Sequence, residues 1–81
     1  MAVTRYFAEQ VVRKRPYLSE SFCRIAIAEA LRHVEQPDGR HRYWGPVRLP
    51  GDEKQRILRV VTLKDGVTIH NAFLDRDFWQ E

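Results

Sequence analysis

Apolar residues change their spacing once along this chain, close to His33. Before that point they recur every three to four residues, which is typical of amphipathic helices that bury one face. After it they alternate with polar residues, which is the period of a β-strand with one buried face. The pattern therefore predicts two N-terminal helices followed by a set of strands.

The first predicted helix runs from Thr4 to about Lys14. The Thr4 hydroxyl can cap its first turn, and Pro16 enforces its end because the residue before a proline avoids the helical region. Three successive cations at 13–15 close the helix. They suit the negative end of the helix dipole, and they can also form a phosphate-contacting patch. The apolar stripe of this helix consists of Tyr6, Phe7, Val11 and Val12.

The second predicted helix begins after a serine cap, at Ser19 or Ser21, and extends to about Arg32. Its apolar stripe should form the main cover of the core. Cys23, the single cysteine of the chain, lies within this stripe, so we expect a buried and unreactive thiol. No intramolecular disulfide is possible.

The dipeptide Asp38-Gly39 is the strongest hairpin signal in the sequence, because Asp-Gly favours a two-residue turn. Such a turn places Glu35 opposite Arg42 in the ladder. The same register places His33 opposite Trp44. The first hairpin is therefore expected to bring Glu35, Arg42 and Trp44 to one face of the sheet.

A second hairpin is predicted from two alternating segments at 56–63 and 67–74, which Asp65-Gly66 joins. A two-residue turn makes Arg59 and His70 diagonal neighbours on the open face. On the opposite face, apolar side chains should meet the helices. The opposing pairs are Leu58 with Phe73, Val60 with Asn71 and Thr62 with Ile69 on the core side, and Arg59 with Ala72 and Val61 with His70 on the other.

Together these elements predict an α+β fold in which two N-terminal helices pack on one face of a four-stranded antiparallel meander sheet. The 81 residues suffice for one small core, so 1–81 is expected to be a single domain. The segment 75–79 should dock over a sheet edge, and a one-residue slip in either hairpin would break the open-face cluster. The core side is expected to carry Tyr43, Leu58, Val60, Ile69 and Phe73, and the open face Glu35, Arg42, Trp44, Arg59 and His70.

Basic side chains outnumber acidic ones, with 14 Lys and Arg against 11 Asp and Glu, a net charge of +3 and a pI near 9.4. Eleven of the 14 are Arg, which favours bidentate contacts with phosphate or carboxylate, although a GC-rich coding bias also produces such an excess. No stretch approaches the roughly 18 apolar residues of a membrane span, and charges follow the N-terminus at once. We therefore expect a cytoplasmic protein without a secretory leader.

The open-face cluster fits RNA as a ligand. Arg neutralises phosphate, Trp stacks on an unpaired base, and a His that titrates near neutrality can move the proton that strand scission requires. The three His are widely separated, and neither a Cys pair nor a phosphate-cradling glycine loop is present in the sequence. The sequence therefore predicts no metal and no nucleotide cofactor.

Three short segments resemble a known toxin family. They are Gly39-Arg40-His41-Arg42-Tyr43-Trp44-Gly45, Leu58-Arg59-Val60-Val61 and Ile69-His70-Asn71-Ala72-Phe73. With the two helices before them, they look like the BrnT-type branch of the RelE/ParE-like toxins, from about Tyr6 to Phe78. The resemblance implies a metal-independent ribonuclease of a type II toxin–antitoxin pair. Such a protein cleaves single-stranded mRNA on its open sheet face, alone or on the ribosome, and a cognate antitoxin silences it.

The resemblance also assigns positions. It places the basic residue before the Trp-Gly pair on Arg42 and the central-strand Arg on Arg59. The polar positions of the last strand fall on His70 and Asn71. Many relatives have a His in the first helix where this chain has Gln10, so a relative that uses that His has no counterpart here.

Each candidate residue has an ordinary structural alternative. His70 would exchange a proton with a ribose 2′-hydroxyl, or it is a packed strand histidine. Arg42 and Arg59 would stabilise the phosphorane charge, or they form ion pairs. Glu35 would be a base or the partner of Arg42, and Trp44 would stack on a base or shield the sheet. The predicted catalytic residues are Arg59, His70, Arg42 and Glu35, and the predicted substrate-binding residues are Trp44, Arg40 and Arg76.

Two other functions fit the same basic face. One is a non-catalytic RNA-binding module, which would bind a long mRNA without cleaving it. The other is an interaction protein whose arginines receive an acidic protein partner. A small acidic or helix-rich reading frame next to the gene would favour the toxin or the interaction protein over a solitary module.

Overall fold

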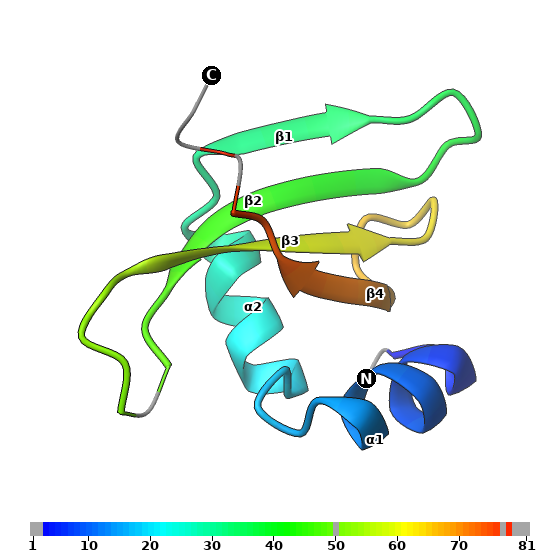
Figure 1. The fold of residues 1–81 in the computed structure, drawn as a ribbon. Coiled ribbons are helices and arrows are strands. Elements are labelled where there is room, and N and C mark those ends of the chain that lie inside the picture. The colour runs from blue at the N-terminus through cyan, green and yellow to red at the C-terminus, as the bar shows by residue number, and fades with distance from the viewer. Residues whose placement is uncertain (1–2, 50, 77, 79–81) are drawn as a thin grey trace.

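The structure, a computed structural model, describes residues 3–49, 51–76 and 78. It has an α+β fold in which the helices precede a four-stranded antiparallel sheet with strand order β1-β2-β3-β4, so the predicted fold class is confirmed (Figure 1). In the described part of the chain, no helix has the length and apolar character needed to cross a membrane. The strands are β1 (Arg32–Glu35), β2 (His41–Val47), β3 (Arg56–Thr62) and β4 (Ile69–Leu74).

The first helical segment covers residues 5–14 and contains a π-helical turn, η1 (Phe7–Val11), followed by α1 (Val12–Lys14). The Phe7 backbone N–H donates to Thr4 Oγ1 over 3.1 Å, which confirms the predicted capping role of Thr4. The helix also ends before Pro16, as predicted.

The second helix, α2 (Glu20–Ala28), begins at the predicted cap, since the Phe22 N–H donates to Ser19 Oγ over 3.4 Å. The prediction that it extends to Arg32 is wrong. The Leu31 N–H already donates to the Trp44 carbonyl over 2.7 Å, so the chain has joined the sheet by that point.

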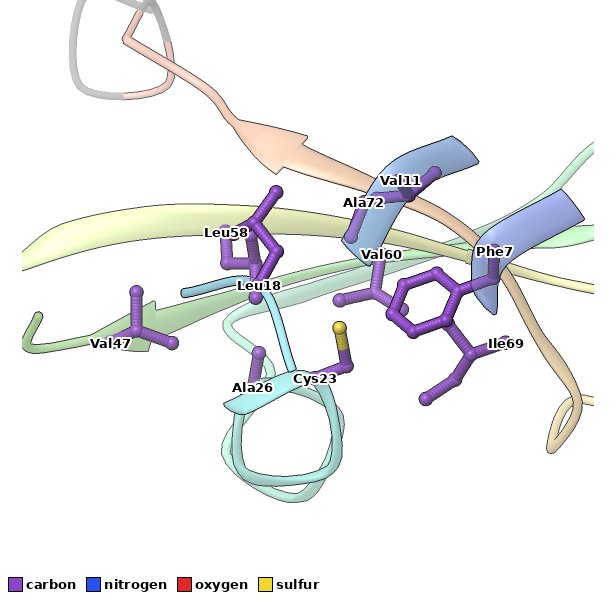
Figure 2. Close-up of a cluster of buried hydrophobic side chains, with 10 residues drawn as sticks. All are labelled: Phe7, Val11, Leu18, Cys23, Ala26, Val47, Leu58, Val60, Ile69 and Ala72. Carbon is purple, nitrogen blue, oxygen red and sulfur yellow. The ribbon is translucent and has the colours of Figure 1, made fainter. Parts of the chain in front are cut away.

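Apolar side chains from η1, α2 and three strands form one core between the helices and the sheet (Figure 2). Cys23 lies within it, fully buried, and burial raises the pKa of its thiol to about 12. The predicted buried thiol is therefore confirmed. The buried cluster consists of Phe7, Val11, Leu18, Cys23, Ala26, Val47, Leu58, Val60, Ile69 and Ala72.

The first hairpin differs from its predicted register by one residue, because Glu35 lies opposite His41 and not opposite Arg42. A two-residue turn needs positive φ at both Asp38 and Gly39, but only Gly39 adopts it, at +92°. Pro37 instead fits the second position of a type I turn, and Gly39 follows in the left-handed region. The Gly39 N–H donates to the Gln36 carbonyl over 2.9 Å.

This register moves Glu35 to the face on which the helices pack. The prediction that Glu35 lies on the open face is therefore wrong. The same face carries His33, whose ring stacks on Tyr43 with centroids 4.3 Å apart. His33 Nε2 lies 2.8 Å from His41 Nδ1. The rings of His33, His41 and Tyr43 thus lie together on the face of the sheet opposite the open face.

The second hairpin begins in the predicted register, with Thr62 opposite Ile69, and then β4 accommodates one extra residue. Beyond this bulge Arg59 lies opposite Phe73, where the regular register predicted Ala72. Ala72 therefore joins Ile69 in the core, with 1% and 0% of their surfaces exposed. The predicted core-side positions of Asn71 and Phe73 are wrong, because both side chains line the open face.

A glycine sets the distance between the helix layer and the sheet. A Cβ atom added at Gly45 on β2 would lie 2.0 Å from the Ala26 carbonyl oxygen of α2. Ala26 is fully buried, so the helix backbone rests directly on the strand.

Replacing Gly45 by alanine should lower the free energy of unfolding by about 1–3 kcal/mol or more, because the helix must move away from the strand. Urea unfolding measures the loss. Gly51→Ala is the control, since a Cβ there meets no atom within 4 Å and only its φ of +79° opposes the change. An equal loss in both variants would show that the close helix contact does not set the layer spacing.

Candidate functional site

The open face of the sheet contains a hollow of about 290 Å³ with a cationic lining. Arg40, Arg42 and Arg59 contribute three guanidinium groups, and His70 an imidazole. None of the described residues that line it is acidic. The remaining lining residues are Tyr6, Gln36, Val61, Asn71 and Phe73.

Strand register places these side chains together. Arg42 on β2 lies opposite Val61 on β3, and Trp44 lies opposite Arg59. Because side chains alternate along a strand, Arg42, Trp44 and Arg59 share one face, as predicted. The bulge in β4 adds Asn71 and Phe73 to the same face.

Arg59 lies between two aromatic rings. Its guanidinium carbon is 4.1 Å from the centroid of Phe73 and 5.9 Å from that of Trp44. Burial lowers the pKa of Arg59, Asp75 acts against this shift, and Arg42 adds to it. Its Nε atom is buried and has no hydrogen-bond partner among the described residues. A bound anion in the hollow that Arg59 lines would add to the charge compensation that Asp75 provides.

His70 is held from the side by the first helical segment. Its Nδ1 lies 3.0 Å from Thr4 Oγ1, and the Tyr6 ring centroid is 5.0 Å from its own. Burial lowers the pKa of His70 below its ordinary value, and Arg40 lowers it further. At neutral pH the imidazole is therefore mainly uncharged, with Nε2 as its second nitrogen for proton exchange.

Trp44 is covered by the segment that follows β4. Its indole N–H donates to Asp75 Oδ2 over 2.8 Å, and the residue is 7% exposed. Arg32 lies over both the Trp44 and the Phe78 rings, at 5.6 and 5.2 Å. Arg32 belongs to the edge strand β1, so the described part of this segment reaches a sheet edge as well as Trp44 (Figure 1). Residues 77 and 79 of the predicted docking segment 75–79 lie outside the described residues. Trp44 in this position shields the sheet and is not accessible to a base.

The structure therefore brings together four of the seven predicted site residues, Arg40, Arg42, Arg59 and His70. Glu35 lies on the opposite face, and Trp44 is covered. Arg76 is exposed but does not line this hollow.

Reasoning from apolar periodicity missed Tyr6, Asn71 and Phe73, although the family resemblance places a polar position of the last strand on Asn71. Tyr6 was assigned to the apolar stripe of the first helix, yet it is 47% exposed. A polar Asn at a position assigned to the core was a possible sign of the bulge, because a bulge reverses the faces that follow it. Phe73 changes face for the same reason.

In the described part of the chain, no three His, Cys, Asp or Glu side chains come close enough to form a metal site. No protein-family model, curated protein or solved structure matches the chain. The resemblance to RelE/ParE-like toxins therefore stays a prediction, and the geometry of the open face must support any proposal on its own.

The lowered pKa of His70 predicts a pH dependence of stability. Well above pH 6.5, the ordinary pKa of the group, His70 is neutral in both states and does not affect the free energy of unfolding through its titration. As the pH falls below 6.5, the unfolded chain gains the proton first, so folding stability falls until the folded state is also protonated. On acidification, the free energy of unfolding of wild type should therefore fall relative to that of His70→Gln. Urea unfolding at pH 7.5, 6.5 and 5.5 measures it.

Histidine NMR titration provides the direct check. A midpoint for His70 at or above 6.5, or parallel stability profiles for the two proteins, would contradict the environment described above.

Proposed function

We propose that this protein is a metal-independent endoribonuclease toxin of a type II toxin–antitoxin system that binds single-stranded RNA over the open face of its sheet. The observation that carries the proposal is the hollow that combines Arg40, Arg42, Arg59 and His70, with no acidic residue among the described residues that line it. Phosphate is the anion that such a set of guanidinium groups suits best, because each fork donates two parallel hydrogen bonds.

The proposed reaction is attack of a ribose 2′-oxygen on the adjacent phosphorus. A bond forms between the 2′-oxygen and phosphorus, and the bond from phosphorus to the 5′-oxygen breaks, which leaves a 2′,3′-cyclic phosphate. Neutral His70 accepts the proton of the 2′-hydroxyl, and a water molecule gives a proton to the leaving 5′-oxygen. The hydroxide that this leaves takes the proton from His70, which restores the neutral imidazole. Arg42 and Arg59 stabilise the additional negative charge of the phosphorane.

The proposal also implies partners and a compartment. A cognate antitoxin would silence the protein by covering the cationic hollow, and acidic side chains are the groups that would do so most directly. The substrate is mRNA, free or on the ribosome, so the site of action is the cytoplasm.

A non-catalytic RNA-binding module is the second candidate. The observation that favours it is the position of Glu35, because among the described residues that line the hollow only His70 has a side chain that titrates near neutral pH. RNA binding needs the arginines alone, whereas cleavage also needs the proton transfer.

The decisive experiment incubates purified, antitoxin-free protein with a long mRNA in EDTA, alone and with translating ribosomes. Wild type should cleave the RNA. Arg42→Ala and Arg59→Ala should each reduce the rate by roughly 10²-fold or more, because each removes charge stabilisation from the transition state. His70→Ala should reduce it by roughly 10²–10⁴-fold and remove its pH dependence near neutrality.

Arg48→Ala is the matched control, because Arg48 is exposed and lines none of the hollows on the open face. Thermal melts establish that each variant is folded. The same hollow variants should relieve growth arrest when the gene is expressed without its neighbouring frame. Intact mRNA in both arms with wild type would refute the nuclease, and binding without cleavage would favour the module.

A further inference from the structure

Two more hollows adjoin the open-face hollow, and Tyr6 and Asn71 line all three. The second has a volume of about 360 Å³ and is lined by Lys14 and Arg15 from the end of the first helical segment. The third, of about 500 Å³, is lined by Arg15 and Arg76. The basic surface thus continues from the hairpin turn, past the edge of β4, to the end of α1.

The charge along this path has one sign. No described residue that lines any of the three hollows is acidic. A long polyanion would therefore meet attractive charge in each hollow. Outside the lining, Asp38 Oδ2 lies 3.9 Å from Arg40 Nε, so at this position a phosphate would compete with a carboxylate. The cations along the path are Lys14, Arg15, Arg40, Arg42, Arg59 and Arg76.

Tyr6 stands where the three hollows meet. Its neighbour Phe7 is 1% exposed and anchors the helix in the core, while Tyr6 itself is 47% exposed. The Tyr6 ring is inclined by 30° to the His70 ring, with 5.0 Å between centroids. An accessible aromatic ring surrounded by cations is the arrangement by which proteins bind unpaired nucleotides, because bases stack on it while the cations contact phosphates.

We propose that Tyr6 is the base-stacking residue of this protein, and that an RNA strand lies along the three hollows with one unpaired base on Tyr6. This inference rests on the proposed RNA binding but not on cleavage. Trp44, the residue expected for this role, is covered by Asp75 and Arg32.

The experiment measures binding of a fluorescent 12-nucleotide oligouridine by anisotropy at several salt concentrations, with a non-cleavable 2′-O-methyl backbone. Tyr6→Ala should weaken binding by roughly 5- to 150-fold, the usual loss for one stacked base. Its salt dependence should not change, since no charge is removed. Arg15→Ala should instead lower the slope of log K against log salt by about 0.7 for each lost phosphate contact.

Two comparisons separate stacking from a structural role. Tyr6→Phe keeps the ring and should bind nearly as wild type, and Ile25→Ala is a matched control because Ile25 is also 47% exposed and lines none of the three hollows. Inorganic polyphosphate has charge but no bases, so Tyr6→Ala should bind it as wild type does.

The outcomes distinguish the two proposals. If wild type binds the oligomer and Tyr6→Ala binds it equally well, or if Tyr6→Ala also loses polyphosphate, the stacking role is wrong while RNA binding stands. If Tyr6→Ala loses oligomer binding while Tyr6→Phe and Ile25→Ala keep it, and wild type cleaves no mRNA, the stacking role is supported and the nuclease is refuted. A wild type that binds no oligomer refutes both.

Discussion

The extra residue in β4 is the constraint on which the site depends. Ile69 and Ala72 are both buried, although three positions separate them and a regular strand would turn them to opposite faces. The Ile69 carbonyl also accepts the Thr4 N–H over 2.8 Å, which fixes this end of β4 against the first helical segment. The bulge allows Ile69 and Ala72 to be buried on the same face. It also directs Phe73 toward the open face, where Phe73 lies against Arg59.

The helix layer determines which face of β2 is buried. Direct contact between Gly45 and Ala26 fixes which face of β2 the helices cover. Trp44, the neighbour of Gly45, must then lie on the other face with Arg59. The segment after β4 covers the Trp44 ring, which removes the largest apolar side chain of this face from water.

The fold class, both helix caps and the open-face positions of Arg42, Trp44, Arg59 and His70 could be predicted from the sequence. We expected that a one-residue slip in either hairpin would break this cluster, and that expectation was wrong for a physical reason. The slip in the first hairpin shifts β1 against β2 and leaves β2 and β3 in register, so it displaces Glu35 alone from the predicted cluster. The bulge comes at His70, so only the residues after it change face.

The missed features are those that depend on contacts distant in sequence. Alternation along one strand cannot show that Ala72 must enter the core together with Ile69, because the helix that covers them is more than fifty residues away. Neither can the periodicity of the first helix show that Tyr6 extends past the edge of β4. Its spacing is that of a core residue, and only the position of the helix at the edge of the sheet exposes it.

The electrostatics of the hollow couple His70 to its proposed ligand. Arg40 contributes to the lowered pKa of His70, and burial contributes more. A phosphate that binds among the arginines would offset the first contribution and add a negative charge near the imidazole, and both effects raise the proton affinity of the ring. The free site therefore holds His70 in the neutral form that a base requires, while the occupied site stabilises the protonated form that the proposed reaction creates. A hollow with a carboxylate in its lining would lose this contrast, because the carboxylate would favour the imidazolium before any RNA arrived.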